Sequence, residues 1–435
     1  MVAILLRMTN ETWWEKAVFY ELYIDKVSGT FLGLIEKLDY YKKLGVTCFH
    51  ILPIFPSPMV DDGYDVSNYM AVRQELGTLD DFKKLIDAAH SKGIRILIDL
   101  VLNHVSSAHP WFVDARASKD SPYRNYFIWS ETKEELKDSV NEFPHLKPDN
   151  WIRNEATNDF YFTTFYAEQP DLNWKEPAVM KEITDVMDFW INLGVDAFRL
   201  DAVTHLIKMD GTRSVGLPET HQVLKKLRAH LDTNGHTDIA FLGEVNDRYE
   251  RAIEYFGNGD ECHMIYNFPL AALILLATKR NTPEILSDIS NKMLSVPKGC
   301  QWVTFLRNHD ELVMPGLTNE EKEELLTYGD ETGIFYFRSL HGVSTRLATF
   351  FEKEPEKIRQ AFLTLLSLPG SPVIYYGEEI GQKNDTTIGE QKDTRRYIRG
   401  TFNWEEATAQ EKDSNSLLSF ITSEIQRRQE KEQGT

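Results

Sequence analysis

The sequence predicts an α/β protein, a (β/α)8 TIM barrel with a small irregular subdomain inserted after its third strand. Eight short apolar runs, rich in β-branched and aromatic residues, are spread along the 435 residues, and a closed parallel barrel needs eight strands. Their nearly continuous apolarity is typical of strands that are covered on both faces. Longer segments with the period of an amphipathic helix lie between the runs, and this alternation favours a barrel over an open sheet.

The predicted strands and helices follow one another in a regular order. The eight apolar runs lie at 17–24, 46–52, 94–102, 195–201, 239–245, 263–268, 302–308 and 372–377. Helices with start and stop signals are predicted at 78–92, 177–193, 218–233 and 356–368. Thr78 and Asp81 form a capping pattern at the start of the first helix, and Pro177 suits the first turn of the second. Gly194 and Asn234-Gly235 are typical helix ends.

One long stretch interrupts this alternation. Residues 104–174 are rich in aromatic residues, Pro, Asn and Asp, and they are too many for a connecting loop, so they predict an inserted subdomain. A second irregular insertion spans about 311–355, and the tail contains one amphipathic helix from Leu417 to Ile425. The resulting division is a first barrel part (1–103), the inserted subdomain (104–174), a second barrel part (175–403) and a C-terminal helix and tail (404–435).

Composition excludes several classes of protein. Lys and Arg number 48 and Asp and Glu 67, which gives a net charge of −19. An acidic surface repels nucleic acid and anionic lipid, so neither is expected as a partner. No run of 18 apolar residues is present, and the apolar start Met1–Met8 is too short for a signal peptide. The three widely spaced cysteines, Cys48, Cys262 and Cys300, build no disulfide framework and favour a cytoplasmic location.

Polar residues cluster where the predicted strands end. Asp99, Asn103 and His104 end the third strand, Arg199 and Asp201 the fourth, Glu244 the fifth, and His309 and Asp310 the seventh. In a closed barrel these ends meet on one rim, where barrel enzymes place catalysis. A single carboxylate there could instead cap a helix or pair with an arginine, as Arg199 could with Asp99. Four carboxylates and two histidines at strand ends of the same polarity favour an active site.

The residue types point to glycosidic bond cleavage. The sequence contains no recognisable Ser or Cys nucleophile beside a His, no Gly-rich phosphate loop and no HExxH zinc helix. Carboxylates remain, together with aromatic residues expected in the pocket walls: Tyr64, Phe165, Trp174 and Tyr376. An oxocarbenium-like transition state needs one anion near the anomeric carbon and one proton donor near the leaving oxygen, and aromatic rings stack on sugar faces.

Several motifs resemble one family. The segments IDLVLNH (98–104), DAFRLDAVTH (196–205), FLGEV (241–245) and FLRNHDE (305–311) resemble, in order, the four signature regions of the α-amylase family, glycoside hydrolase family 13. QPDLNW (169–174) is similar to the fifth region. Four further segments look most like the trehalose synthase and α-glucosidase branch: LPIFPSPMVDDGYDVSNY (52–69), LPETHQVLKKLR (217–228), GDECHM (259–264) and SLPGSPVIYYGEEIG (367–381).

The resemblance implies a role for each matching residue. Asp201 would be the nucleophile, Glu244 the general acid and base, and Asp310 the residue that holds the 2- and 3-hydroxyls of the sugar. Arg199 would orient Asp201, and His104 and His309 would donate to sugar hydroxyls. Tyr64 would stack on the glucose ring beside Phe165. Asp65 would bind the hydroxyls of the non-reducing end and pair with Arg395, with Arg396 as the alternative partner. His205 and the apolar-strand His50 are expected to be structural.

The chain departs from the family in three places. The Asp-rich calcium loop that many relatives carry after the first strand is absent. The family's other calcium site would use Asn103 and Asp171, but Lys208 stands at what looks like a glutamate position and would place an ammonium against the metal. A structural calcium is therefore only an option, and no cofactor is expected to be required. The chain ends where relatives continue into a C-terminal β-sandwich, so that domain is not expected here; either the protein is a minimal version of the family or the sequence is shortened.

Three functions are compatible with these residues. The favoured one is a retaining α-glucosidase or transglucosidase that acts on short neutral α-glucosides such as maltose-type disaccharides and oligosaccharides. The alternative is a maltose–trehalose isomerase, a trehalose synthase, which would use the same intermediate. The missing calcium loop, Lys208 and the altered segment 393–404 favour hydrolysis. A non-catalytic sugar-binding protein is disfavoured because all three acids are present. The oligomeric state stays open.

Overall fold

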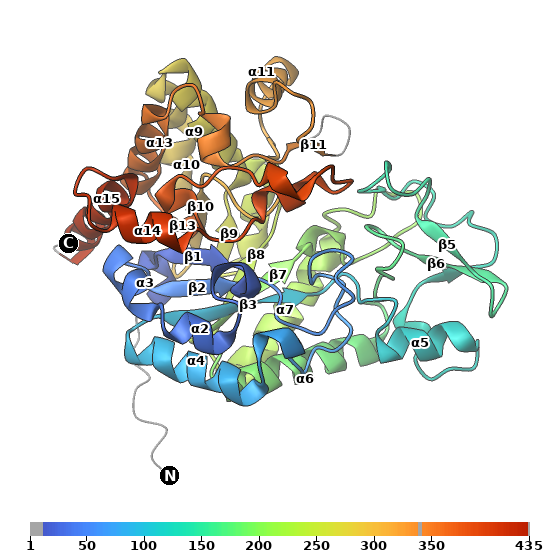
Figure 1. Cartoon of the computed structure of the whole chain (residues 1–435). Helices are drawn as coiled ribbons and strands as arrows, with labels where there is room; N and C mark the ends of the chain where they lie inside the picture. Colours follow the sequence, from blue (N-terminus) through green and yellow to red (C-terminus); the bar gives the residue numbers. More distant parts are fainter. Residues whose placement is uncertain (1–11, 338–341, 434–435) are drawn as a thin grey trace, which may run out of the picture.

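The computed structural model describes residues 12–337 and 342–433, and it contains the predicted closed barrel of eight parallel strands (Figure 1). Around the barrel the strands follow the order β1-β13-β10-β9-β8-β7-β3-β2. They are β1 (Phe19–Leu22), β2 (Cys48–Ile51), β3 (Arg95–Val101), β7 (Ala197–Asp201), β8 (Ala240–Gly243), β9 (Met264–Tyr266), β10 (Gln301–Phe305) and β13 (Ser371–Tyr375). Each predicted run overlaps one strand, so the fold class is confirmed. The apolar start Met1–Met8 lies outside the described residues.

Alternating side chains along the strands build two layers of core. Leu97, Ala197, Leu242, Met264 and Val303, from five successive strands, belong to one buried cluster. Their strand neighbours, such as Ile96, Phe198 and Phe241, belong to a second cluster that includes the surrounding helices. Successive side chains of a strand point to opposite faces, so the first cluster fills the barrel and the second joins it to the helical layer.

The four helices predicted from start and stop signals are present. They are α4 (Leu79–Ser91), α6 (Pro177–Leu193), α7 (Pro218–Thr233) and α13 (Glu356–Ser367). Thr78 and Asp81 form the predicted capping box, and Gly194 ends α6 in the left-handed region at φ 112°. The other helices are α1 (Ile24–Val27), α2 (Phe31–Ile35), α3 (Leu38–Leu44), α5 (Pro110–Ala117), α8 (Tyr249–Ala252), α9 (Phe268–Arg280), α10 (Ser287–Met293), α11 (Asn319–Gly329), α12 (Leu347–Phe350), α14 (Trp404–Gln410) and α15 (Leu417–Gln433).

The residues predicted as an insertion form a small sheet that projects from one side of the barrel (Figure 1). Its antiparallel strands are β4 (Trp129–Ser130), β5 (Trp151–Asn154) and β6 (Asp159–Phe162), with β6 in the middle. The second insertion carries α11, α12 and the short hairpin of β11 (Tyr336–Phe337) and β12 (Gly342–Val343). The domain boundaries drawn at 103, 174 and 403 stay a predicted division.

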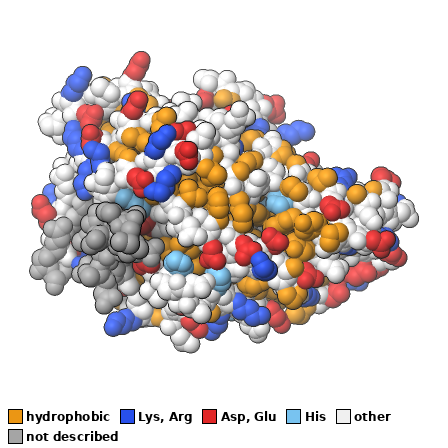
Figure 2. Space-filling model, turned by 90° about the horizontal axis from the view of Figure 1, so that it is seen from below, with side chains coloured by type: hydrophobic (Ala, Val, Ile, Leu, Met, Phe, Trp, Pro, Cys, Tyr) orange, Lys and Arg blue, Asp and Glu red, His pale blue; other side chains and the backbone are white. Residues whose placement is uncertain are grey.

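The surface carries charges of both signs. On the face seen from below in Figure 2, acidic and basic side chains are scattered around a band of hydrophobic side chains that runs from the barrel toward the inserted subdomain. No helix within residues 12–337 and 342–433 has the length and apolarity that crossing a membrane requires. Cys48, Cys262 and Cys300 are all free and buried.

A buried lysine holds the inserted subdomain to the barrel. The ammonium of Lys208 lies 2.7 Å from Oδ1 of Asn103 and 2.8 Å from a carboxylate oxygen of Asp171, and it also donates to the backbone carbonyl of His205. Asn103 follows β3 and His205 follows β7. Asp171 comes from the end of the insertion, where its backbone forms an antiparallel β-bridge with that of His104. One cation therefore ties two strand ends to the subdomain.

The same arrangement corrects the predicted calcium site. Asn103 and Asp171 come together as that prediction required, but the ammonium of Lys208 fills the space between their oxygens. Calcium binds about six to eight oxygen ligands and would repel an ammonium at this distance, so these residues do not fit the ion. Among the described residues, no group of three or more His, Cys, Asp or Glu side chains is placed to hold a metal.

We expect Lys208→Met to lower the free energy of unfolding by about 3–5 kcal/mol, because it leaves the carboxylate of Asp171 buried and uncompensated. Urea unfolding followed by circular dichroism measures the loss. Lys225→Met is the matched control, since its ammonium lies 3.2 Å from Asp260 at the surface and should contribute less than about 1 kcal/mol. A chelator or added calcium should leave the melting temperature of the wild-type protein unchanged. A melting temperature that falls in the chelator would contradict the ion-pair assignment.

Candidate active site

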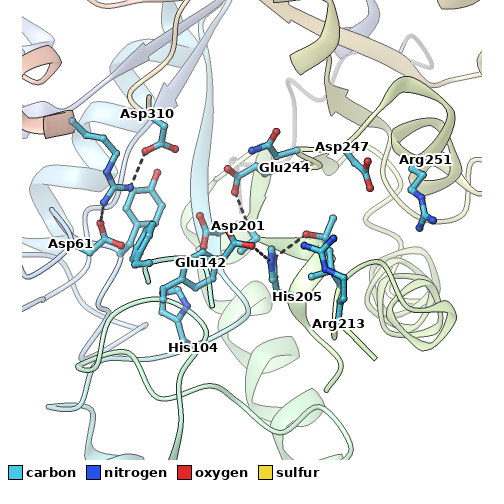
Figure 3. Close-up of a pocket in the computed structure, with 18 residues that line it drawn as sticks. Asp61, His104, Glu142, Asp201, His205, Arg213, Glu244, Asp247, Arg251 and Asp310 are labelled. Atoms are coloured by element: carbon cyan, nitrogen blue, oxygen red, sulfur yellow. Dashed lines mark hydrogen bonds and ion pairs between the residues drawn. The ribbon is translucent and has the colours of Figure 1, made fainter. Parts of the chain in front are cut away.

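A cavity of about 500 Å³ opens at the carboxyl ends of the barrel strands (Figure 3). Seven of the predicted site residues line it: Tyr64, His104, Phe165, Asp201, Glu244, Asp310 and Arg395. The other lining residues are Asp61, Glu142, Phe143, Ala202, Thr204, His205, Arg213, Val215, Asn246, Asp247 and Arg251. Its volume is in the usual range for small-molecule sites.

The two central carboxylates share one arginine. Arg199, from β7, is 1% exposed, and its Nη1 donates to Asp201 at 2.5 Å and to Asp99 at 2.7 Å. Its Nη2 lies 2.9 Å from Oε2 of Glu244, which follows β8. The predicted orientation of Asp201 by Arg199 and the alternative pairing of Arg199 with Asp99 are therefore both present. Because one planar guanidinium binds both carboxylates, they face the same cavity, as Figure 3 shows.

A strained residue completes this arrangement. Ala202, directly after Asp201, has a left-handed backbone with φ 48°. That conformation costs a non-glycine residue about 1–2 kcal/mol. The resulting turn aims the backbone N–H of Ala202 at Oε2 of Glu244, 2.9 Å away. The strain thus fixes Glu244 relative to Asp201.

Burial and the neighbouring charges act on the protonation of Asp201. Burial, with Glu244 and Asp99 close by, raises the pKa of Asp201, while Arg199 opposes the shift. Both donors to Glu244 bind its Oε2, and Asp201 makes the shortest contact with Arg199. This geometry leaves Oε1 of Glu244 without a donor among the described residues and places the closest positive charge on Asp201.

The third acid is held by two arginines. Asp310 lies 3.2 Å from Nη1 of Arg395 and 2.9 Å from Nη2 of Arg399, and Nε2 of His309 is 3.3 Å from its other oxygen. Burial alone would raise the pKa of Asp310, but His309, Arg395 and Arg399 hold it well below its usual range. Asp310 therefore stays ionised as an acceptor for hydroxyl groups. Arg399 was missed by the sequence analysis, which considered Arg395 and Arg396.

His309 has a different place from the one expected. Its Nδ1 lies 2.9 Å from Glu21, and its Nε2 lies 2.7 Å from the hydroxyl of Tyr64, on which its ring also stacks. Both nitrogens thus have protein partners, so His309 positions Tyr64 and Asp310. Beneath it His50 bridges Glu21 and Asp99, at 3.3 and 3.1 Å. Burial alone would lower the pKa of His50, but the two carboxylates raise it to about 9.

The predicted pair of Asp65 and Arg395 is wrong. Asp65 is fully buried and accepts hydrogen bonds from the Ser57 hydroxyl and from the backbone of Val60 and Asp61, so it shapes the loop. Arg395 instead binds Asp61 at 2.7 Å. The DDGYD segment contains three aspartates, and only the turn of the loop decides which of them faces the cavity.

His104 is prepared as a hydrogen-bond donor. Oδ1 of Asn103 accepts from Lys208, so Nδ2 of Asn103 faces Nδ1 of His104 at 3.3 Å. An amide NH₂ only donates, which makes Nδ1 the acceptor and places the ring proton on Nε2. Nε2 of His104 is buried without a partner among the described residues. Burial lowers the pKa of His104 to about 4, so the ring is neutral near pH 7.

Two expected aromatic walls lie elsewhere. The indole of Trp174 donates to the carbonyl of Leu102 and the hydroxyl of Tyr376 to that of Gly400, and neither side chain lines the cavity. Phe165 is in place, with its ring centroid 5.4 Å from those of His104 and His205. On the far side of the cavity, Arg213 comes from the loop that follows β7 and Arg251 from the four-residue helix α8.

The arrangement suits a neutral ring held between acids. An aromatic face and three carboxyl groups, those of Asp201, Glu244 and Asp310, surround one space that carries the polar groups a sugar requires. Asp61, Arg395 and Asp310 form an ion-pair cluster at one end of the cavity, the closed end. These groups need no cofactor to cleave a glycosidic bond.

Sequence comparisons agree with this geometry. Residues 8–345 match the family model described as "Alpha amylase, catalytic domain". The trehalose synthase of Pimelobacter sp. is 38% identical over 405 residues, covering 89% of this chain and 70% of that protein. The trehalose synthase/amylase TreS of Mycobacterium tuberculosis is 40% identical over 403 residues, covering 90% and 67%. The oligo-1,6-glucosidase of Heyndrickxia coagulans is 33% identical over 401 residues, covering 86% and 67%.

Solved structures share the fold. The trehalulose synthase MutB from Pseudomonas mesoacidophila has a TM-score of 0.74 at 24% identity and covers 97% of this chain and 84% of its own. The trehalose-6-phosphate hydrolase TreA of Bacillus licheniformis has a TM-score of 0.74 at 24% identity, covering 96% and 84%. The chain therefore belongs to the α-amylase family, glycoside hydrolase family 13, and is an enzyme that acts on glycosides.

Proposed function

We propose that the protein is a retaining α-glucosidase or transglucosidase that acts on short α-glucosides such as maltose-type disaccharides and oligosaccharides. The observation that carries this proposal is the placement of Asp201 and Glu244 on one guanidinium, facing one cavity. A retaining mechanism needs carboxyls about 5 Å apart, and binding to the two Nη atoms of one guanidinium holds Asp201 and Glu244 near each other.

In the first step Asp201 attacks the anomeric carbon. The bond from that carbon to the leaving oxygen breaks, and Glu244 transfers its proton to the oxygen, giving a covalent β-glucosyl ester on Asp201. Arg199 keeps Asp201 ionised until attack. Asp310 and the Nε2–H of His104 bind ring hydroxyls and favour the distorted ring of the transition state.

In the second step Glu244, now ionised, removes a proton from the acceptor. The acceptor oxygen attacks the anomeric carbon, the ester to Asp201 breaks, and the α-configuration is restored. Water as the acceptor gives hydrolysis, and a sugar hydroxyl gives transfer.

The closed end of the cavity supports an exo-acting enzyme. Arg395 joins Asp61 and Asp310 at distances of 2.7 and 3.2 Å, and an ion-pair cluster at this end of the cavity favours a site that ends after one glucose. We infer that a terminal glucosyl residue binds here, with Tyr64 under its ring. The small sugar partner and a cytoplasmic location are part of this proposal.

A second candidate function is maltose–trehalose isomerisation. It is favoured by the identity of 38–40% to proteins named trehalose synthase, over about nine tenths of this chain. The chemistry is the same up to the glucosyl ester; released glucose then turns and re-attacks before water does.

Asp201→Asn and Glu244→Gln should each lower turnover of maltose by at least about 10³-fold with an unchanged far-UV circular dichroism spectrum. With 4-nitrophenyl α-glucoside the two variants should lose activity to different extents, because the nitrophenolate leaving group departs without much protonation. Glu244→Gln should therefore lose less activity on this substrate than on maltose, while Asp201→Asn loses both. Equal losses on the two substrates in both variants would argue against Glu244 as the acid.

The pH dependence of kcat/KM should be bell-shaped. As the pH rises Glu244 loses its proton and protonation of the leaving oxygen fails; as the pH falls Asp201 gains a proton and cannot attack. Since burial and the neighbouring carboxylates raise the pKa of Asp201, the acidic limb should lie above the ordinary aspartate range. With 4-nitrophenyl α-glucoside, Glu244→Gln should remove the alkaline limb and leave the acidic one. An alkaline limb that persists unchanged would show that another group controls it.

Products from maltose decide between the two functions. We expect glucose and short transfer products to exceed trehalose in a time course resolved by anion-exchange chromatography. The same assay on isomaltose, trehalose, sucrose and starch would show the linkage preference. A trehalose yield well above free glucose would reverse the order of the two proposals.

A further inference from the structure

We propose that the open side of the cavity binds an anionic group, a phosphate or a carboxylate, on the molecule that leaves or receives the glucosyl unit. Arg213 and Arg251 would hold this group. The proposal rests on the proposed glucosyl transfer at Asp201 and extends it: the glucosyl unit is neutral, but its partner carries negative charge.

The two arginines differ from the other arginines around the cavity. Arg199 binds three carboxylates, and Arg395 and Arg399 both bind Asp310 and further aspartates. Arg213 and Arg251 line the cavity, yet neither guanidinium has a hydrogen bond or an ion pair with any described residue. Their positive charges are therefore available to a ligand.

Figure 3 places both arginines on the side of the cavity opposite Asp61 and Asp310, beyond Glu244. Glu244 protonates the leaving oxygen, so the part of the substrate that departs must lie on this side. Arg213 comes from the loop between β7 and α7, and Arg251 from α8 after β8. A loop and a short helix thus each bring a cation to the place where the leaving group or acceptor would bind.

The loop that carries Arg213 comes close to the segment of Arg251 and Tyr255 at Gly216. A Cβ at that glycine would lie 3.8 Å from Nη1 of Arg251 and 3.7 Å from the hydroxyl of Tyr255. Gly216 follows Arg213 by three residues and has φ +62°, so its backbone turns there. The Tyr255 hydroxyl is buried with no partner among the described residues, and burial raises its pKa well above the ordinary tyrosine value, so it keeps its proton. A further donor without a partner among the described residues therefore lies near Arg251.

The nearby acids do not neutralise this pair. Glu142 lies 3.2 Å from His205, and Asp247 accepts the backbone N–H of Arg248 at 2.7 Å. Neither forms an ion pair with Arg213 or Arg251. In a chain of net charge −19, an anionic ligand is repelled unless the site itself is locally positive. Guanidinium groups bind phosphate and carboxylate through paired hydrogen bonds, which a neutral hydroxyl cannot match.

Calorimetric titration of the wild-type protein with glucose, glucose 6-phosphate and glucuronate tests the proposal. We expect at least one of the two anionic sugars to bind about tenfold or more tightly than glucose at low salt, because hydrogen bonds between charged groups are the strong ones. The phosphate and carboxylate probes distinguish the two sources of charge. High salt should reduce the advantage.

The double variant Arg213→Gln/Arg251→Gln should lose that advantage while it still binds glucose, which also reports that it is folded. Arg248→Gln is the matched control: this exposed arginine belongs to the same loop as Asp247 but does not line the cavity, so its variant should keep the preference. Equal affinity of the wild-type protein for all three sugars, or a preference that survives in the double variant, would overturn the proposal.

Hydrolysis of 4-nitrophenyl α-glucoside by the same samples separates this proposal from the proposed function. Turnover without any preference for an anionic sugar refutes the anion site alone. A preference without turnover of any α-glucoside refutes the proposed function and keeps the anion site. Each result thus decides one of the two.

Discussion

The buried guanidinium of Arg199 is the constraint on which the site depends. It contacts Asp99, Asp201 and Glu244 from beneath the cavity, and its charge makes their proximity tolerable. Removing a charge from such a cluster leaves the others uncompensated, so the acids and the arginine form one unit. The raised pKa of Asp201 follows from the excess of carboxylates around a single arginine.

A second buried cation acts at a distance from the reacting atoms. Lys208 binds Asn103 and Asp171, and through the amide of Asn103 it determines which nitrogen of His104 carries the proton. The ammonium of Lys208 can hold these oxygen atoms in place by itself, because it carries three hydrogen-bond donors. The side chain of Lys208 therefore both attaches the inserted subdomain and places the ring proton of His104 on Nε2.

The sequence predicted the barrel and the three acids because both depend on local patterns. Continuous apolar runs marked all eight strands, and strand ends necessarily gather on one rim. Such patterns do not predict the geometry of a loop. Asp61 and Asp65 are both aspartates of one segment, and the turn between them decides that Asp61 lines the cavity. His309 and Arg399 were misjudged or missed for the same reason, because their partners, Glu21 and Asp62, lie far away in sequence. Lys208 was recognised, but its contacts needed coordinates.

The two halves of the cavity use charge in opposite ways. At the closed end Arg395 and Arg399 are paired with aspartates. Their positive charges are therefore already balanced, and this end of the cavity suits an uncharged glucosyl ring. At the open end the guanidinium groups of Arg213 and Arg251 line the cavity and have no hydrogen-bond or ion-pair partner within residues 12–337 and 342–433. The closed end is built on barrel strands and the loops next to them, and the catalytic reaction requires these segments to keep their positions. The open end is built on loops that can vary without disturbing Asp201, so specificity for the second half of the substrate can change while catalysis is kept.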